Sequence, residues 1–383
     1  MKICAIICEY NPFHNGHAYH IRQAKALTGA DAVLCLMSGN FVQRGEAAIL
    51  DKRTRAKHAL LFGADAVLEL PVLFATSNAE LFAKGALSLL AKIPDVTHLC
   101  FGAEHADKEE FLRLAALLND EPQEVSTRIN ALLGDGLSYA KSYATAWTEF
   151  SGSPLLSSPN DILGLEYTKA ILAQNSQIEI VPVKREGNGY LDESLSGVFA
   201  SASAVRKGLL RGERECVASQ LPHEVFSDLP KTVQSSLSIM ERTAILLKSK
   251  EELRGVLDCA EGLENALKRA AAETDGFVEK LTSTRYTASR IRRIALHTLL
   301  NIREDFIRDS LNAPLYLAPL GYRKERADLL ASLSRANLPF LASGKDVKAL
   351  TGVARECFEK EEFADLIYAV ATGVTPNSSP ILL

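Results

Sequence analysis

A series of short, continuously apolar runs in the first half of the chain constrains its fold most. Five such runs occur, at residues 3–8, 32–37, 66–70, 96–101 and 178–183. Because apolar residues follow one another instead of alternating with polar ones, we expect strands that are buried on both faces, as in a parallel sheet. Amphipathic stretches of helical length, residues 17–27 and 52–62, separate the first runs. This alternation predicts an α/β fold with a Rossmann-like, doubly wound parallel sheet.

The rest of the chain has a mainly helical pattern. Residues 104–177 predict helices inserted between the fourth and fifth strands, and the Gly- and Ser-rich segment 187–203 has the composition of a mobile active-site loop. Almost every stretch from residue 204 to residue 383 is helical in period. We therefore expect two domains, an α/β domain at 1–203 and a mainly α-helical C-terminal domain at 204–383.

The composition indicates a soluble protein that is not basic overall. The formal net charge is −4, so a nucleic-acid partner would need a local basic patch. Cys4, Cys8, Cys35 and Cys100 fall in the apolar runs, where free thiols behave as small buried hydrophobes. No apolar stretch reaches the roughly 18 residues of a membrane helix, and the first run is too short for a signal peptide. Reduced thiols suggest the cytoplasm.

The turn after the first run carries the clearest chemical signal. It reads EYNPFHNGH at residues 9–17 and opens the first helix. Ligands bind at this edge of an open parallel sheet, and a helix N-terminus attracts phosphate. Gly16 permits close approach, while His14 and His17 are spaced so that both imidazoles can hold phosphate oxygens. A plain helix cap remains an alternative, and so does a metal site, although no third ligand stands in register.

This turn resembles that of the nucleotidyltransferase superfamily, which includes coenzyme adenylyltransferases, pantothenate synthetase and the class I aminoacyl-tRNA synthetases. The superfamily carries a second motif, a Ser/Thr-rich loop that ends in a basic residue. SASAVR at residues 201–206 stands where that loop is expected, with Ala202 at one position. Its hydroxyls and Arg206 are expected to bind the β- and γ-phosphates and the departing pyrophosphate, although Ser203 as a helix N-cap explains the pattern equally well.

Further segments are similar to one family of that superfamily, the bacterial tRNA(Met) cytidine acetate ligases. They are residues 7–20, SGNFVQRGE at 38–46, GADAVLELP at 63–71, SPNDILG at 158–164 and TSTRYT at 282–287. The ATP contacts implied by the family, with the two serines of the second motif, are Ile7, Cys8, Glu9, Tyr10, Asn11, Pro12, Phe13, His14, Asn15, Gly16, His17, Ala18, Tyr19, His20, Gly102, Asn160, Arg185, Ser201 and Ser203. We expect His14, His17 and Arg206 to be the catalytic residues.

Four positions can also be interpreted from their own place in the chain. Gly102 follows the fourth run, where a missing Cβ leaves room for adenosine. Asn160 lies in a Ser-Pro-Asn-Asp turn, so base recognition and ordinary turn chemistry explain it equally well. Arg185 follows the fifth run and can pair with phosphate or stack on adenine, although an isolated Arg is more often a surface residue. Arg44 faces the same edge and either holds a small carboxylate or shapes its loop.

The resemblance implies a two-step reaction with ATP and, with it, Mg²⁺. Acetate attacks the α-phosphate to give acetyl-adenylate and pyrophosphate. The exocyclic amine of the wobble cytidine of elongator tRNA(Met) then takes the acetyl group, which gives N4-acetylcytidine and AMP. No covalent enzyme nucleophile is needed, so positioning and charge stabilisation can carry adenylation. The sequence does not name a base for the second step.

A basic run in the helical half is the predicted tRNA contact. Residues 280–293 read KLTSTRYTASRIRR, with five positive charges and no acid. A helix there places Arg290, Arg293 and His297 on one face, and Tyr286 offers a stacking platform for an unpaired base. A solvated helix face is the ordinary explanation for so short a run, and the family resemblance favours tRNA. The predicted contacts are Lys280, Arg285, Tyr286, Arg290, Arg292 and Arg293.

Two other classes of function remain possible. A small-molecule adenylyltransferase or a pantothenate synthetase-like ligase would share the phosphate site, but the basic run in a helical half argues against it. A non-catalytic RNA-binding protein on the same fold would be free to lose His14, Gly16 and His17, and all three are present.

Overall fold

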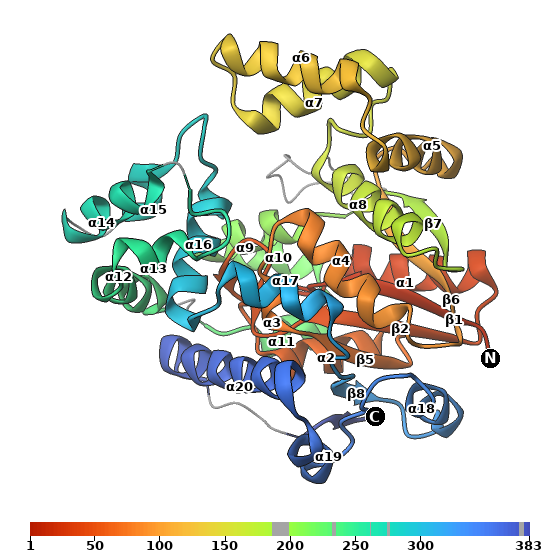
Figure 1. The fold of residues 1–383 in the computed structure, drawn as a ribbon. Coiled ribbons are helices and arrows are strands. Elements are labelled where there is room, and N and C mark those ends of the chain that lie inside the picture. Colours follow the sequence, from red (N-terminus) through yellow and green to blue (C-terminus); the bar gives the residue numbers. More distant parts are fainter. Residues whose placement is uncertain (186–198, 232–234, 261, 274–275, 375–378) are drawn as a thin grey trace.

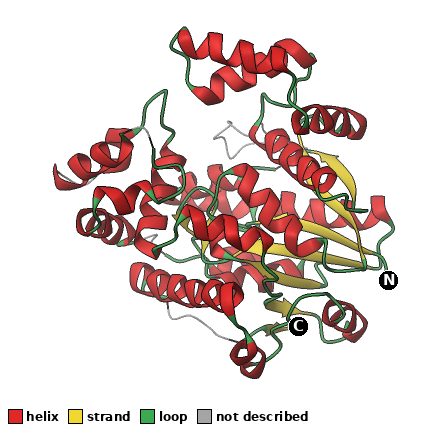
Figure 2. Cartoon of the chain, viewed as in Figure 1, coloured by secondary structure: helices red, strands yellow, loops and turns green. Residues whose placement is uncertain are grey.

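A seven-stranded sheet with helices on both sides forms the centre of the molecule (Figures 1 and 2). The computed structural model describes residues 1–185, 199–231, 235–260, 262–273, 276–374 and 379–383. The strand order is β7-β6-β1-β2-β5-β8-β9, and β3 and β4 form a separate hairpin. The strands are β1 (Ile3–Cys8), β2 (Ala32–Ser38), β3 (Phe41–Val42), β4 (Glu46–Ala47), β5 (Ala66–Leu70), β6 (Val96–Ala103), β7 (Glu179–Lys184), β8 (Pro319–Tyr322) and β9 (Ile381–Leu382).

The helices fall into groups along the chain. Before β6 lie α1 (Asn15–Thr28), α2 (Lys52–Leu61), α3 (Val72–Ala75) and α4 (Ala79–Leu90). Between β6 and β7 lie α5 (Lys108–Asn119), α6 (Gln123–Gly134), α7 (Tyr139–Ser151) and α8 (Pro159–Ala173). After β7 come α9 (Ala202–Leu210), α10 (Arg214–Gln220), α11 (His223–Asp228), α12 (Leu237–Leu247), α13 (Lys250–Arg254), α14 (Leu263–Glu273), α15 (Phe277–Leu281), α16 (Ala288–Leu300) and α17 (Glu304–Asn312). After β8 come α18 (Ala327–Ser334), α19 (Gly344–Ala349) and α20 (Gly352–Thr372).

All five predicted strands are present and run parallel to one another. β1 pairs with β2 and β6, β2 pairs with β5, and β6 pairs with β7. The ends of these strands lie within two residues of the ends of the apolar runs. The predicted Rossmann-like, doubly wound sheet is therefore confirmed.

Successive residues of the central strands enter two different cores. Ile3 and Ala5 of β1 pack on the side of α3, α4 and α8. Cys4 and Ile6 pack on the opposite side with α1, α2 and α9. Because helices cover both faces, a polar side chain at either position would be buried, which explains why residues 3–8 and 32–37 are apolar without interruption.

The C-terminal half contains strands that its helical pattern does not predict. β8 pairs antiparallel with β5, and β9 pairs parallel with β8, so residues after 204 complete one edge of the sheet. β8 is four residues long and contains Pro319 and Gly321, both poor strand signals. A Cβ at Gly321 would lie 2.9 Å from the Ile381 carbonyl oxygen, so the strands approach closely because of this glycine. The boundary near residue 203 stays a prediction, and a cut there would remove this sheet edge.

Helices α12 to α16 have a core of their own. Ile245, Leu267, Phe277 and Ile291 pack together in it, apart from the sheet. The second half of α16 leaves this core, since Leu296 and Leu300 pack in the core of the sheet. Helix α16 therefore joins the helical part of the chain to the sheet. In the described parts of the chain, no helix is both long and apolar enough to cross a membrane.

A buried ion cluster fastens α20 to the sheet. Lys52 Nζ lies 2.6 Å from Glu69 Oε1, 2.7 Å from Asp365 Oδ2 and 3.7 Å from Glu361 Oε1. The second oxygen of Glu361 accepts a hydrogen bond of 2.7 Å from the Val72 backbone N–H. The three carboxylates are close enough together to hold a metal ion, but the Lys52 ammonium already serves as their cation. Burial raises the pKa of Glu361 well above its usual range, because the ionised carboxylate is poorly solvated there, and the Lys52 charge acts to lower it.

We expect Lys52→Met to lower the free energy of unfolding by about 3–5 kcal/mol, because it leaves the buried carboxylates without their cation. Urea denaturation followed by circular dichroism measures this loss. Lys84→Met is the control, since it breaks an exposed i,i+4 pair with Glu80 and should cost less than about 1 kcal/mol. Equal losses in the two variants would contradict the role given to the cluster.

Candidate active site

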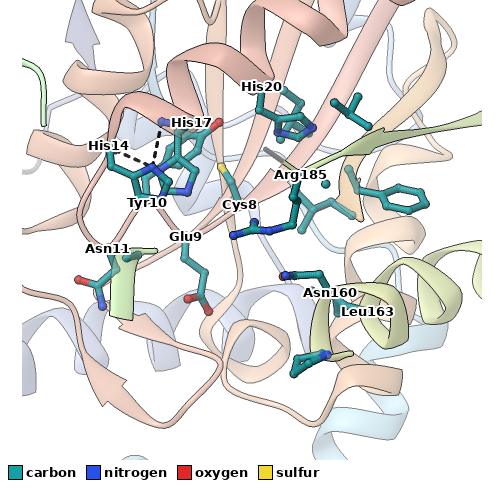
Figure 3. Close-up of a pocket in the computed structure, with 18 of the residues that line it drawn as sticks. Cys8, Glu9, Tyr10, Asn11, His14, His17, His20, Asn160, Leu163 and Arg185 are labelled. Atoms are coloured by element: carbon teal, nitrogen blue, oxygen red, sulfur yellow. Dashed lines mark hydrogen bonds between the residues drawn. The ribbon is translucent and has the colours of Figure 1, made fainter. Parts of the chain in front are cut away.

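A cavity of about 290 Å³ opens at the carboxyl edge of β1, β6 and β7 (Figure 3). The end of β1, the start of α1, the start of α8 and the start of α9 all contribute to its wall. It therefore lies where the sheet topology predicts a ligand site. Of the predicted ATP contacts, those on its wall are Ile7, Cys8, Glu9, Tyr10, Asn11, His14, Gly16, His17, Tyr19, His20, Gly102, Asn160 and Arg185.

The two histidines of the turn are stacked, with ring centroids 3.6 Å apart. His14 is the N-cap of α1, and its Nδ1 accepts a hydrogen bond of 3.1 Å from the Gly16 backbone N–H. His17 Nδ1 accepts one of 3.2 Å from the His14 backbone N–H. A neutral imidazole whose Nδ1 accepts carries its proton on Nε2. Capping thus fixes the tautomer, and the two rings offer the cavity a pair of Nε2–H donors (Figure 3).

Burial keeps these rings uncharged. It lowers the pKa of His14 to about 3 and that of His20 to about 4, and it holds the pKa of His17 well below the usual range. The Arg185 guanidinium lowers the pKa of all three further. At neutral pH the rings are therefore hydrogen-bond donors and not proton donors, which suits them to phosphate oxygens. Their Nδ1 contacts leave the metal alternative without support.

The two glycines of the cavity leave space for different groups. A Cβ on Gly16 would lie 3.0 Å from the His14 ring and 3.4 Å from Phe199, so this glycine keeps the helix start open. A Cβ on Gly102 would lie 3.3 Å from Arg185 Cγ. The space beside Gly102 is thus occupied by the stem of Arg185, where the sequence predicts adenosine.

The Glu104 carboxylate contacts the side chains of two predicted nucleotide-binding residues, Asn160 and Arg185. No sequence motif marks Glu104. Asn160 Nδ2 donates to Glu104 Oε1 over 2.8 Å, and Arg185 Nε lies 3.5 Å from the same oxygen. Ser158 Oγ donates to the other oxygen over 2.9 Å. Ser158 also caps α8, so Asn160 is not the residue that forms this turn. Its side chain instead faces the cavity beside Arg185 (Figure 3), which favours the ligand-binding interpretation.

The second motif places its guanidinium in the cavity and its hydroxyls elsewhere. Arg206 lines the cavity and donates to the Asn11 carbonyl oxygen over 2.9 Å and to Ser203 Oγ over 3.3 Å. The N-cap of α9 is Ser201, whose Oγ accepts from the Ala204 N–H, so the cap expected at Ser203 is wrong by two residues. Residues 187–198 of the predicted active-site loop lie outside the described residues.

Several predicted ATP contacts lie off the described wall of the cavity. Phe13 is a core residue that stacks on Phe62, with ring centroids 5.4 Å apart. A continuous motif includes such residues because the turn needs them for packing. Those off the wall are Pro12, Phe13, Asn15, Ala18, Ser201 and Ser203.

The hairpin of β3 and β4 closes one side of the cavity. Gln43 and Arg44, at its tip, line the wall. The Gln43 backbone N–H donates to Glu9 Oε1 over 2.8 Å, which ties the tip to the end of β1.

The other side of this hairpin rests on α16. Gly45 has a φ of +72°, and a Cβ there would lie 2.6 Å from backbone atoms of both Arg292 and Arg293. Glu46 also pairs with Arg292 across 3.0 Å. The hairpin thus connects the cavity to the helix that carries the basic run.

The predicted basic face of α16 is packed against the protein. Arg290 donates to the Asp258 carbonyl oxygen over 2.7 Å, and Arg293 lies 3.4 Å from the Asp258 carboxylate. His297 is buried and lies 2.8 Å from Thr76 Oγ1. The three residues share a face, as the helical period predicts, but that face binds the Asp258 turn and α3 and does not present a free basic surface.

The exposed part of the basic run lies just before α16. Tyr286 has the guanidinium carbons of Arg285 and Arg290 at 5.4 and 5.1 Å from its ring centroid. Arg285 and Lys280 are exposed, and Lys280 pairs with Glu273. An aromatic ring with cationic neighbours at a surface turn is an arrangement that suits an unpaired base.

Similarity to known proteins identifies the family of this chain. Residues 1–379 match the family described as HIGH Nucleotidyl Transferase. The tRNA(Met) cytidine acetate ligase of Caldanaerobacter subterraneus subsp. tengcongensis is 37% identical over 97% of this chain and 96% of its own length. That of Leuconostoc citreum is 38% identical over 89% of this chain and 87% of its own length. This chain belongs to the tRNA(Met) cytidine acetate ligase family.

Solved structures agree with this assignment. The crystal structure of Thermotoga maritima TmcAL in its apo form I superposes with a TM-score of 0.91 at 31% identity, over the whole of both chains. A second TmcAL structure, bound with alpha-thio ATP, superposes with a TM-score of 0.88. The family resemblance inferred from the sequence is confirmed, and so is the fold of a tRNA(Met) cytidine acetate ligase.

We expect Glu104→Ala to weaken ATP binding about tenfold, because it removes the carboxylate that accepts a hydrogen bond from Asn160 and pairs with Arg185, the two expected nucleotide contacts. Isothermal titration with ATP measures the affinity. The control is Glu109→Ala, an exposed carboxylate on the next helix, which should leave the affinity unchanged. Equal affinities in the two variants would show that Glu104 does not position the nucleotide site.

Proposed function

We propose that this protein activates acetate with ATP as acetyl-adenylate and then acetylates N4 of the wobble cytidine of elongator tRNA(Met). The observation that carries the proposal is the pair of stacked, neutral histidines above Gly16. They stand in a chain that aligns along 97% of its length with an enzyme named for that reaction. The reaction class is that of a ligase that converts ATP to AMP and pyrophosphate.

We place the triphosphate of ATP at the turn between β1 and α1. The Nε2–H groups of His14 and His17 then face the α-phosphate, where negative charge grows as acetate attacks. Arg206 faces the departing pyrophosphate. Asn160 and Arg185, on the opposite wall, are the proposed contacts of the nucleoside. Mg²⁺ would enter with ATP, held mostly by phosphate oxygens, as the cavity offers few carboxylates.

Acetate has a proposed place beside Asn11. The Asn11 side chain is 2% exposed, and its Oδ1 accepts a hydrogen bond of 2.9 Å from the Ile49 N–H. Its Nδ2 is buried without a partner among the described residues, so a donor is left for a ligand. Arg44 lines the same cavity. An amide donor and a guanidinium together form a site for a small carboxylate, which favours this role of Arg44 over a purely structural one.

We place the tRNA on the C-terminal part, residues 204–383, with the turn before α16 as the main contact and residues 1–203 as the ATP-binding catalytic part. The hairpin on α16 would set the bound anticodon beside the mouth of the cavity. Free thiols throughout the chain agree with a proposed location in the cytoplasm.

Acetate is expected to drive exchange of pyrophosphate into ATP, and His17→Ala should slow this exchange about 10²-fold, since one donor to the developing charge is lost. Exchange of labelled pyrophosphate is the measurement, and tRNA binding should persist in the variant. His223→Ala, at an exposed histidine of α11, is the control. If pantoate or a nucleotide supports exchange and acetate does not, a small-molecule adenylyltransferase or pantothenate synthetase-like ligase is the better assignment.

Arg285→Ala should weaken tRNA binding and reduce the slope of log affinity against log salt by about one, as for a lost phosphate contact. It should leave acetate-dependent exchange unchanged. Arg290 and Arg293 are poorer test positions, because both hold the Asp258 turn in place. Arg308→Ala removes the same charge from an exposed site on α17 and serves as the control. A salt slope that is equal in the two variants would remove this turn from the tRNA surface.

A further inference from the structure

Glu9 is the one carboxylate among the described residues that line the cavity, and the adenylation step gives it no task. Its charge would repel phosphate oxygens, so its side chain is a poor contact for ATP. We propose that Glu9 is the general base of the second step, in which it accepts the proton that the cytidine N4 amine loses as it attacks acetyl-adenylate. This inference rests on the proposed function and assigns a residue to its second half.

The surroundings of Glu9 anchor one carboxylate oxygen and leave the other available. Its backbone oxygen accepts a hydrogen bond of 2.5 Å from Arg55 Nη1, which fixes the end of β1. Its Oε1 accepts one of 2.8 Å from the Gln43 N–H. No described residue donates to Oε2 within hydrogen-bond distance. Figure 3 shows the side chain extending between Asn11 and Asn160, which the proposed function gives to acetate and to the nucleoside.

Three arginines on three elements supply the positive charge around Glu9. Burial raises the pKa of its carboxyl, while Arg206 of α9, Arg55 of α2 and Arg44 of the hairpin act to lower it. Tyr167 of α8 also lies near Glu9, and burial holds the pKa of Tyr167 well above the usual range. The net effect is a raised pKa, which makes the ionised Glu9 carboxylate a stronger base than an exposed one.

The other titratable groups of the cavity are unsuited to this task. The low pKa of His14, His17 and His20 makes these rings weak bases. Burial raises the pKa of Cys8 and Tyr10 well above the usual range, so both stay protonated. The cationic groups on the wall, which carry no free lone pair at neutral pH, are Arg44, Lys184, Arg185 and Arg206.

The proposed step balances without a further reactant. The amine nitrogen forms a bond to the acetyl carbon, and its proton passes to Glu9 Oε2. The bond from the acetyl carbon to the phosphate oxygen then breaks, and AMP leaves with the electron pair. Glu9 returns the proton to solvent. The products are the N4-acetylated base, AMP and one proton.

The approach of the tRNA agrees with this role. The Gln43 N–H that anchors Glu9 belongs to the hairpin whose other side rests on α16 at Gly45. A nucleic acid bound at the start of α16 would therefore present its base from the side on which Glu9 is held. The histidine turn lies at the start of α1, so the two steps use different residues of one cavity.

The experiment separates the two steps in Glu9→Gln. Because Glu9 lies on the wall of the ATP cavity, acetate-dependent pyrophosphate exchange in the same variant is the reference. Transfer from preformed enzyme-bound acetyl-adenylate to tRNA should slow in single turnover by about 10²- to 10⁴-fold more than exchange does. In the natural protein the transfer rate should rise with pH through the pKa of Glu9 and then level off, and the variant should lose that rise. Glu109→Gln is the matched surface control. Melting temperature and ATP affinity report whether the fold and the nucleotide site are intact.

Glu9→Asp keeps a carboxylate that is one methylene shorter, so it should retain the rise with pH at a reduced rate, and it carries the test if the Gln variant does not fold. Transfer at the natural rate in Glu9→Gln would overturn the inference. Loss of exchange together with transfer, with a higher requirement for Mg²⁺, would make Glu9 a cation ligand and overturn it as well. Absence of acetate-dependent exchange in the natural protein would refute the proposed function itself, whatever Glu9 does.

Discussion

The active site depends on the burial of β1 on both of its faces. Because α1 and α2 cover one face and α3, α4 and α8 the other, β1 can carry no polar side chain before it ends. Polar chemistry therefore begins at Glu9, the first residue after the strand, and continues into the start of α1. There the backbone N–H groups of a helix start need acceptors, and His14 and His17 provide them with Nδ1. The turn that carries the two histidines is thus also an ordinary solution to helix capping.

The same burial shifts the pKa values of the ionisable groups of the cavity in different directions. Loss of solvent disfavours the charged form of every group, so it lowers the pKa of imidazoles and raises that of a carboxyl. His14 and His17 become permanent neutral donors, and Glu9 becomes a stronger base. The arginines around the cavity act on the pKa of Glu9 in the opposite direction and lower it. One physical cause therefore underlies both proposed roles, stabilisation of an anion by the histidines and acceptance of a proton by Glu9.

The sequence predicts those parts of the fold that local patterns determine. The five parallel strands and the turn at residues 9–17 are visible because continuous apolarity and a helix start are properties of neighbouring residues. Glu104 is missed because its partner Asn160 is 56 residues away. The helical period of α16 correctly places Arg290 and Arg293 on one face. That face was expected to be exposed to solvent, but it packs against Asp258, which lies 32 residues before Arg290 in the chain. Contacts between distant segments decide which face of a helix is free.

The contact between the hairpin and α16 makes the two halves of the chain parts of one site. Gly45 must lack a side chain for the hairpin to lie on the backbone of Arg292 and Arg293, and the same hairpin holds Glu9 through Gln43. Helix α16 is itself fixed at one end in the helical core and at the other in the core of the sheet. The predicted boundary near residue 203 separates sequence patterns, whereas the cavity is lined by residues from both sides of it, among them His14 and Arg206.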